Sequence, residues 1–255
     1  MGGSSMRWWL ASLGTLAALA MTAFCGCGVP VGSTGDAKRD AAERARNAEQ
    51  EARWKQYEEQ TNVIRKRLEA SARKPEFAEV VRLVERETGA RAEPLQLEEP
   101  FEGGVVYKVP AARFEQQVAR WQGLVAGKGC FLFRLENHFG IGGQPDLLAL
   151  VPTADVEEVI LLVGTSGNGL EYKGKELLTP DIVAWLRQHA QEQPFQITGV
   201  GGDFIEGRYL TPIKDPRGLA AKIYEFCPDV VDQGTGTVER LADELTKGKL
   251  FFWWD

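Results

Sequence analysis

Histidine and clustered positive charge are both scarce in this chain, and each absence removes a class of function. The 255 residues include two histidines, His138 and His189, so a metal site built from several histidines is not expected. The net charge of −6 offers no basic surface of the kind that phosphate backbones require, which argues against a nucleic-acid partner. The glycine-rich segments 140–143 and 234–237 lack the lysine of a P-loop. We therefore predict no metal ion and no cofactor.

The first residues indicate the compartment. Arg7 precedes an apolar run, Trp8 to Phe24, which has the length of a signal-peptide core and is short for a membrane span. The run ends in FCGC, and small residues before a cysteine at this place resemble a bacterial lipoprotein signal. The resemblance implies that residues 1–27 are a signal ending at Cys27, which is acylated and anchors the protein to a membrane of the cell envelope. A membrane helix that is kept intact is the alternative.

Cysteine is also scarce once such a signal is removed. Cys25 leaves with the signal, and Cys130 and Cys227 remain in the folded part. Outside the cytoplasm these two residues can form a disulfide. Two buried free thiols fit the sequence equally well, because the spacing of cysteines does not reveal their geometry.

A long charged helix is expected after a short linker of residues 28–35. Residues 36–74 are rich in Ala, Glu, Arg and Lys and contain no Gly or Pro. Their apolar stripe is made of Ala and is not sustained by Leu or Ile, which argues against a coiled coil. Because charges of both signs favour a solvated helix, we interpret this segment as a spacer. A partner-binding helix around Trp54 and Tyr57 is the alternative.

Strand and helix patterns alternate through residues 75–255, which we predict to be the globular domain. The expected strands are residues 104–109, 130–135, 147–151, 195–200, 204–210 and 249–254, and the expected helices begin at Pro75, Pro110, Thr153, Thr179, Asp215 and Thr237. The strands do not follow a repeated strand–helix–strand order. The pattern therefore predicts an α/β (α+β) fold with a mixed β-sheet flanked by helices, preceded by the long N-terminal helix.

Several stretches of the C-terminal half together carry a family resemblance. They are PDLLALVPT (145–153), AWLR followed by QPFQITGVGGDFIEGRYL (within 184–210), YEFCPDVVDQGTG (224–236) and the terminal WWD. On these residues the chain from about 130 to 255 resembles the bacterial family called domain of unknown function 4253. The resemblance implies a shared fold and no particular activity.

The segment 226–237 is the stretch around which we expect the site to be organised. It places a thiol, two acids, an amide and two glycines between two helices, and loops on a rigid scaffold often carry function. Paired carboxylates can share acid–base work or hold a hard cation. The catalytic candidates are Glu206, Asp229, Asp232 and His138. A structural ion pair of Arg208 with Asp229 or Asp232, and a turn at Asp203, explain the acids without catalysis.

Two further residue groups are candidates for a pocket or a partner surface. Trp253 and Trp254 point to opposite faces of the last strand, so one should lie in the core and the other should be available to a partner. Arg208 and Gln233 are the polar candidates. Cys227 and His189 are expected to be packed, structural residues.

Two functions of different classes follow from these observations. The first is an envelope lipoprotein whose C-terminal domain binds a protein or a small ligand, with toxin-neutralising, immunity-type binding as one instance. The second is a hydrolase that uses the acids of the 229–232 loop with Glu206 or His138. Geometry distinguishes them, because convergence of these side chains in one pocket would favour the enzyme.

Overall fold

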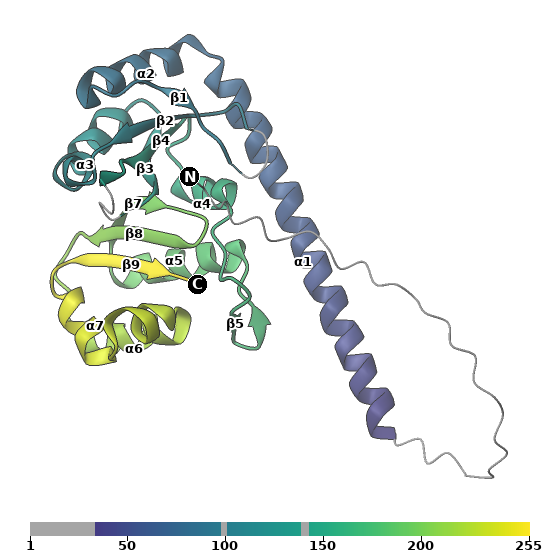
Figure 1. Ribbon diagram of the computed structural model, residues 1–255. Helices are drawn as coiled ribbons and strands as arrows, with labels where there is room; N and C mark the ends of the chain where they lie inside the picture. Colours follow the sequence, from purple (N-terminus) through teal and green to yellow (C-terminus); the bar gives the residue numbers. More distant parts are fainter. Residues whose placement is uncertain (1–33, 98–100, 139–142) are drawn as a thin grey trace, which may run out of the picture. The chain divides into compact units, whose positions relative to one another are not determined.

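A computed structural model describes residues 34–97, 101–138 and 143–255 of the chain (Figure 1). The chain divides after Arg44 into two units, and the C-terminal unit, residues 45–255, holds the sheet and its helices. The predicted signal and its Cys27 lie outside the described residues. No helix in the described ranges is long and apolar enough to cross a membrane.

Helix α1, Thr34–Ala72, is the long helix that the charged segment predicts. It is not a spacer over its whole length, because Ile64 is 6% exposed and Leu68 is fully buried in the main hydrophobic core. These two residues are four positions apart and therefore share one face of the helix. The globular body consequently begins before residue 75, the boundary that we predicted.

The C-terminal unit is built on one seven-stranded sheet, which confirms the predicted mixed sheet flanked by helices. The strands are β1 (Glu93–Pro94), β2 (Val105–Val109), β3 (Phe131–Glu136), β4 (Asp146–Val151), β7 (Phe195–Val200), β8 (Phe204–Tyr209) and β9 (Lys249–Trp253). Their order in the sheet is β1-β2-β4-β3-β7-β8-β9. Strands β3 and β7 pair in parallel, and the other neighbours pair antiparallel.

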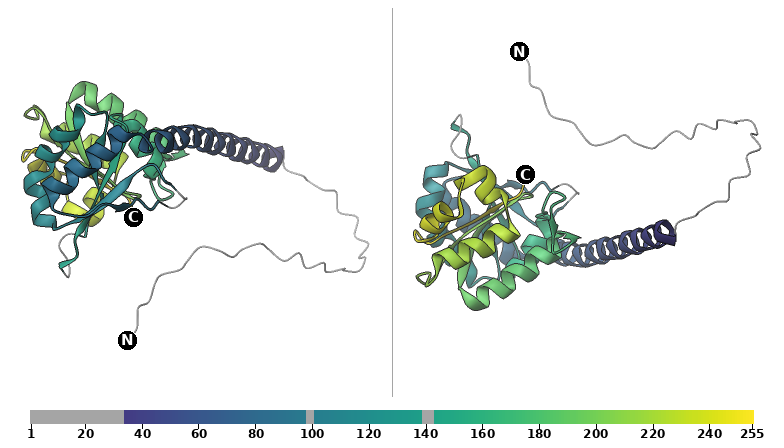
Figure 2. Two further views of the ribbon diagram at one scale, coloured as in Figure 1. Left: turned by 90° about the horizontal axis from the view of Figure 1, so that it is seen from above. Right: turned by 90° about the horizontal axis from the view of Figure 1, so that it is seen from below.

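Helices cover both faces of this sheet (Figure 2). They are α2 (Pro75–Thr88), α3 (Ala111–Ala126), α4 (Val156–Val163), α5 (Thr179–Glu192), α6 (Pro216–Phe226) and α7 (Val238–Leu245). Alternation along β4 shows how the faces are separated, since Leu148 and Leu150 pack with α2 and α3 whereas Ala149 and Val151 pack with α4 to α7. Every one of these four residues is fully buried.

Three local features differ from the sequence prediction. Residues 171–176, for which no strand was predicted, form a small hairpin of β5 (Glu171–Tyr172) and β6 (Lys175–Glu176). Helix α4 is capped by Asp155, whose carboxylate accepts from the Glu157 N–H, rather than by Thr153. The expected loop after α6 contains a π-helical segment, Val230–Thr235, before Thr237 caps α7 as predicted.

Candidate functional site: a cleft between helices α5 and α6

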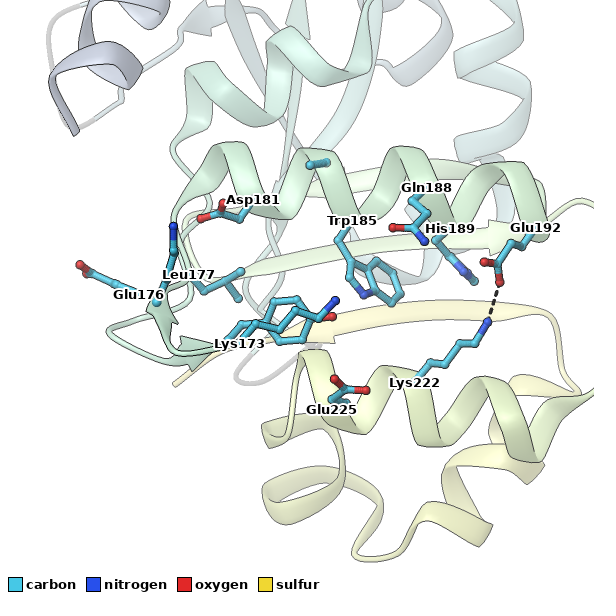
Figure 3. A pocket seen from close by; sticks show the side chains of 13 residues that line it. Lys173, Glu176, Leu177, Asp181, Trp185, Gln188, His189, Glu192, Lys222 and Glu225 are labelled. Carbon is cyan, nitrogen blue, oxygen red and sulfur yellow. Dashed lines mark hydrogen bonds and ion pairs between the residues drawn. The ribbon is translucent and has the colours of Figure 1, made fainter. Parts of the chain in front are cut away.

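A cleft of about 480 Å³ opens between α5, α6 and the β5–β6 hairpin. Figure 3 shows Trp185 and His189 reaching from α5 toward α6, with Lys222 and Glu225 facing them from α6. The volume is within the range of about 300–1,000 Å³ that is usual for ligand sites. The cleft is therefore large enough for a small molecule or for one or two side chains of a partner.

The floor of the cleft is aromatic. The indole of Trp185 stacks on Phe226 with ring centroids 4.3 Å apart and planes 8° from parallel. Phe226 is fully buried, and it also contacts Tyr172 of the hairpin edge-on at 5.4 Å. Trp185 is therefore held in place by the core while it remains partly accessible from the cleft. A rigid, half-buried indole is the kind of side chain that dominates binding energy at protein interfaces.

The rim of the cleft carries charges of both signs. Lys222 of α6 pairs with Glu192 of α5 at 2.7 Å, and this contact lowers the pKa of Glu192 (Figure 3). Lys173 lies over the ring of Tyr172, 4.9 Å from its centroid. In the described ranges, no hydrogen bond or ion pair engages the carboxylate of Glu225. Lys173 and Glu225 are thus charges of opposite sign that a ligand can reach.

Helix α1 holds the hairpin side of the rim. Arg53 forms an ion pair with Asp181, and Gln50 donates a hydrogen bond to Glu176. Lys175 of the hairpin pairs with Glu49 of the helix. These contacts join residues that are more than a hundred positions apart in the chain, and no sequence pattern indicated them. The position of the rim therefore depends on α1 as well as on the hairpin.

His189 is a packed residue, as predicted, although one edge of its ring lines the cleft. The ring is 5% exposed, its Nε2 lies 3.0 Å from the Tyr209 hydroxyl, and burial lowers its pKa to about 4. The imidazole is consequently neutral at pH 7 and already hydrogen-bonded. It contributes to the shape of the cleft rather than a charge.

The acids of the 226–237 segment are not part of this cleft. Asp229 accepts hydrogen bonds from the Asp255 N–H at 3.1 Å and from the Gln233 side chain at 3.1 Å, and Asp232 accepts one from the Tyr224 hydroxyl. The Cys227 thiol, which is fully buried, donates to the carbonyl of Trp253 at 3.0 Å. The segment thus fastens the C-terminal end of β9. We therefore interpret the segment as a structural one, which holds the end of the chain in place, and not as the functional loop that the sequence suggested.

Glu206 lies elsewhere, in a buried ionic network on the α3 side of the sheet. Arg134 of β3 is 2% exposed and contacts three carboxylates, Glu206 at 2.7 Å, Asp146 at 3.0 Å and Glu115 at 2.7 Å. Its guanidinium also lies 3.8 Å from the ring centroid of Phe114. Burial raises the pKa of Glu206 to about 7, against the opposing effect of Arg134. We name these charged residues the Arg134 network.

The predicted ion pair of Arg208 with Asp229 or Asp232 is wrong, because Arg208 bonds to a different residue. Arg208 follows Glu206 on the same face of β8, but its guanidinium donates to the Gln196 side chain at 2.8 Å and does not reach Asp229 or Asp232. Gln196 in turn donates to Gln122 of α3. Neither Arg208 nor Gln233 lines the cleft.

His138 and Trp253 are the candidates that the structure brings together. They line a groove at the end of β3, which Asp203 also lines. Trp253 is partly exposed and Trp254 is fully buried against Phe226, so the predicted division of the two tryptophans is confirmed. The four catalytic candidates therefore occupy three separate places, and the arrangement that the hydrolase hypothesis requires is not found among the described residues.

The two cysteines of the folded part are free and buried. Cys130 belongs to the hydrophobic cluster of α2 and α3, whereas Cys227 belongs to the cluster on the other side of the sheet. The sheet separates them, so the disulfide that the sequence allowed is not formed. Burial raises the pKa of Cys130 to about 11 and that of Cys227 to about 12, which leaves both thiols protonated and unreactive. In the described ranges, no group of three or more His, Cys, Asp and Glu side chains is placed to hold a metal ion.

The geometry defines an α/β protein with a mixed sheet and an aromatic cleft between two helices of one face. Residues 147–255 match the model of the family described as Domain of unknown function (DUF4253), which confirms the resemblance for the C-terminal part of the chain. The match begins within β4, later than the position near residue 130 that we predicted. No curated protein and no solved structure matches the chain.

Proposed function

We propose that this protein is a lipid-anchored binding protein of the cell envelope, and that the cleft between α5 and α6 receives a segment of a partner protein. The observation that carries the proposal is the half-buried indole of Trp185, stacked on Phe226 at the floor of the cleft and surrounded by charges of both signs. Aromatic anchors with a polar rim are typical of sites where proteins recognise each other. Immunity-type binding of a toxin is one instance of such a role.

The charges of the cleft favour a polar partner segment over an apolar ligand. The lining contains three lysines, Lys173, Lys175 and Lys222, and four acids, Glu176, Asp181, Glu192 and Glu225. Five of these groups are paired with each other or with α1, but an apolar ligand would leave Lys173 and Glu225 without compensation, whereas a peptide can offer both charged side chains and backbone groups. The accessible pair Lys173 and Glu225 would then orient the segment across the indole.

A photo-crosslinking experiment in intact cells tests the cleft. A photoreactive amino acid at Gln188, which is exposed and lines the cleft, is expected to yield a covalent adduct with one partner protein. Gln188→Arg, which places a large charged side chain in the cleft, should weaken binding of the identified partner by about tenfold or more. Adducts that form equally from a photoreactive residue at the exposed Asp243 of α7 would contradict the proposal.

Asp232→Ala provides the matched control for this experiment. Asp232 is exposed, accepts from Tyr224 and does not line the cleft, so its loss should leave the affinity for the partner unchanged. Equal losses of binding in Asp232→Ala and Gln188→Arg would show that the cleft is not the site. Thermal melts of both variants confirm that each is folded.

The lipid anchor has its own test, independent of the cleft. Replacement Cys27→Ser should move the protein from the membrane fraction to the soluble fraction, because a single sulfur carries the proposed anchor. Mass spectrometry of the wild-type N-terminus should find Cys27 as the first residue with an added diacylglyceryl group. An unmodified chain that retains residues 8–24 would reject the anchor.

A further inference from the structure

A second site lies away from the cleft, at the carboxyl ends of the two parallel strands. Strand β3 ends at Glu136, and β7 ends at Val200 just before the turn that holds Asp203. The helix before β3 is α3, on one face of the sheet, and the helix before β7 is α5, on the other face. In doubly wound α/β sheets, ligands bind in a crevice outside the carboxyl ends of the parallel strands, which makes the corresponding end of this parallel pair a candidate ligand site. Here β3 and β7 continue into the antiparallel strands β4 and β8 rather than into helices.

The surface at this place is hollowed into two adjoining cavities. One of about 420 Å³ is lined by His138, Asp203 and Trp253, and the other, of about 580 Å³, extends from Asp203 toward Trp54 of α1. Both cavities share Leu135, Glu136, Gly202 and Asp203. We name the two together the edge groove. It does not overlap the cleft, because the two share no lining residue.

The charge of the edge groove has one sign. Among the described residues, its ionisable lining side chains are those of Glu136, Asp203, His138 and Tyr57, and none of the lining residues is a Lys or Arg. In the part of the chain that the structure describes, no hydrogen bond or ion pair engages the Asp203 carboxylate, whereas its carbonyl accepts from Trp254 N–H. Among the described residues, the one ion-pair partner of the Glu136 carboxylate is His138, whose Nε2 lies 3.6 Å away. Both carboxylates therefore have unused hydrogen-bonding capacity.

Aromatic rings line the same groove. On β9, Leu250 and Phe252 are buried beneath α6 and α7, whereas Phe251 and Trp253 point to the other face and stay partly exposed. Trp253 lies opposite Phe204 in the sheet register. The π face of an indole attracts cations, and nearby carboxylates add a direct electrostatic attraction. Two carboxylates beside a partly exposed tryptophan, with no lysine or arginine among the described lining residues, match a cationic ligand.

We propose that the edge groove binds an organic cation, an alkylammonium or guanidinium group, between Trp253 and the carboxylates of Asp203 and Glu136. A hard divalent metal ion fits less well, because such ions need a shell of several oxygen ligands and the described residues hold no metal cluster. The group comes either from a free amine or from a basic side chain of a protein. The proposal does not depend on the function assigned to the cleft.

Calorimetric titration of the full-length, detergent-solubilised protein tests this site. Arginine amide is the probe, and citrulline amide, which has nearly the same shape but no charge, is the control ligand. We expect arginine amide to bind at least about tenfold more tightly than citrulline amide, with affinity that falls as salt rises. Equal affinity for the two probes, or no heat from either, would overturn the proposal.

Paired variants locate the binding site. The double replacement Glu136→Gln and Asp203→Asn keeps the shape of the groove and should weaken arginine amide by about tenfold or more. Trp253→Leu should also weaken it, through loss of the cation–π contact. Glu225→Gln removes an acid from the cleft and should leave the affinity for arginine amide unchanged, because Glu225 does not line the edge groove. Loss of binding in Glu225→Gln to the same extent, or full binding in the double variant, would refute the assignment.

A third comparison identifies the source of the cation. The peptide acetyl-Gly-Arg-Gly-amide presents the guanidinium on a backbone, and spermidine presents free ammonium groups. Tighter binding of the peptide than of arginine amide supports a basic segment of a protein, because the second cavity, which reaches Trp54, would then accept the flanking backbone. Tighter binding of spermidine supports a free amine.

Discussion

The two faces of the sheet stabilise the same fold by different chemistry. On the α3 face, Arg134 and Asp146 are almost completely buried and paired, and Glu206 joins them. On the opposite face, Trp254 and Phe226 pack edge to face, without charge. On the charged face, Arg134 of β3 meets carboxylates from β4 and β8, whereas the aromatic face is held by the packing of apolar rings. The cleft lies over the aromatic face, so its floor is rigid.

The largest effect should come from removing Arg134, the buried arginine of the charged face. Arg134→Met leaves the carboxylates of Asp146 and Glu206 buried without a cation. We expect the free energy of unfolding to fall by about 5 kcal/mol. Urea denaturation measures it. Arg208→Met, which changes an exposed arginine two strands away, should cost far less.

A compensating variant sharpens this prediction. Adding Asp146→Asn and Glu206→Gln to Arg134→Met removes the uncompensated charges and should restore much of the lost stability. No recovery in the triple variant would mean that Arg134 acts through its contact with Phe114 and its packing rather than through its charge.

On the aromatic face, Trp254→Ala should cost about 3–5 kcal/mol, because it leaves a cavity beneath α6. Trp253→Ala, one residue earlier on the partly exposed face, should cost less than half as much. The two melting curves measured side by side check the comparison. Equal losses would show that the burial of Trp254 does not set its contribution.

The two faces should also titrate in opposite directions. Glu206 has its pKa raised by burial from 4.5 to about 7, so the native state holds a proton that the unfolded chain loses. This contribution lowers stability as pH rises from about 4.5 to 7, by on the order of 2–3 kcal/mol. Glu206→Gln should remove that part of the slope, which unfolding curves at pH 5 and pH 7.5 would show. If the free energy of unfolding of Glu206→Gln depended on pH as steeply as that of the wild type, the raised pKa of Glu206 would be contradicted.

His189 on the aromatic face has the reverse effect. Burial lowers its pKa from 6.5 to about 4. Between these two pH values the imidazole is protonated in the unfolded chain and neutral in the native state. Its contribution lowers stability as pH falls from about 6.5 to 4, by a similar order of magnitude. His189→Gln, which can still bond to Tyr209, should flatten the acid side of the profile and leave the side above pH 7 as it was.

The smallest effect concerns the two buried thiols, Cys130 in the hydrophobic cluster on the α3 face and Cys227 in the cluster on the opposite face. Native protein should resist alkylation at Cys130 and Cys227, and both should react once the chain is denatured without reductant. Peptide mass spectrometry distinguishes the two positions. Detection of a peptide in which they are linked would contradict the separation of the cysteines by the sheet.

Periodicity and caps predicted most of the regular structure. The β3 strand and the helix that begins after Pro110 were predicted because burial repeats with the period of a strand or a helix, as it does at Phe114, Val118 and Trp121 of α3. The β5–β6 hairpin was missed because its strands are two residues long. The π-helical segment Val230–Thr235 was missed because its acid, Asp232, and its glycine, Gly234, also suit a loop.

The candidate site was predicted less well than the fold. Asp229 and Asp232 looked available because the sequence does not show which donors reach them, and the structure supplies Gln233, Tyr224 and the backbone of Asp255. Trp185 lies on a helix that the sequence predicts, but nothing in that helix indicates that Phe226 lies beneath the indole. The acidic, aromatic character of the edge groove likewise appears only when β3, β7 and β9 are assembled.

By itself, the sequence determined most of the helices and strands, the mixed sheet and the placement of Trp253 and Trp254 on opposite faces, because these follow from local periodicity and from the burial of apolar side chains. The tertiary structure decided that Trp254 is the buried one. Only the tertiary structure decided the partners of Arg134 and Glu206, the docking of α1 on the hairpin and the place of the cleft. These depend on contacts such as Glu192 with Lys222, between helices joined through two strands. Contacts over such distances leave no periodic trace in the chain, since their energy is gained only when the whole sheet has formed.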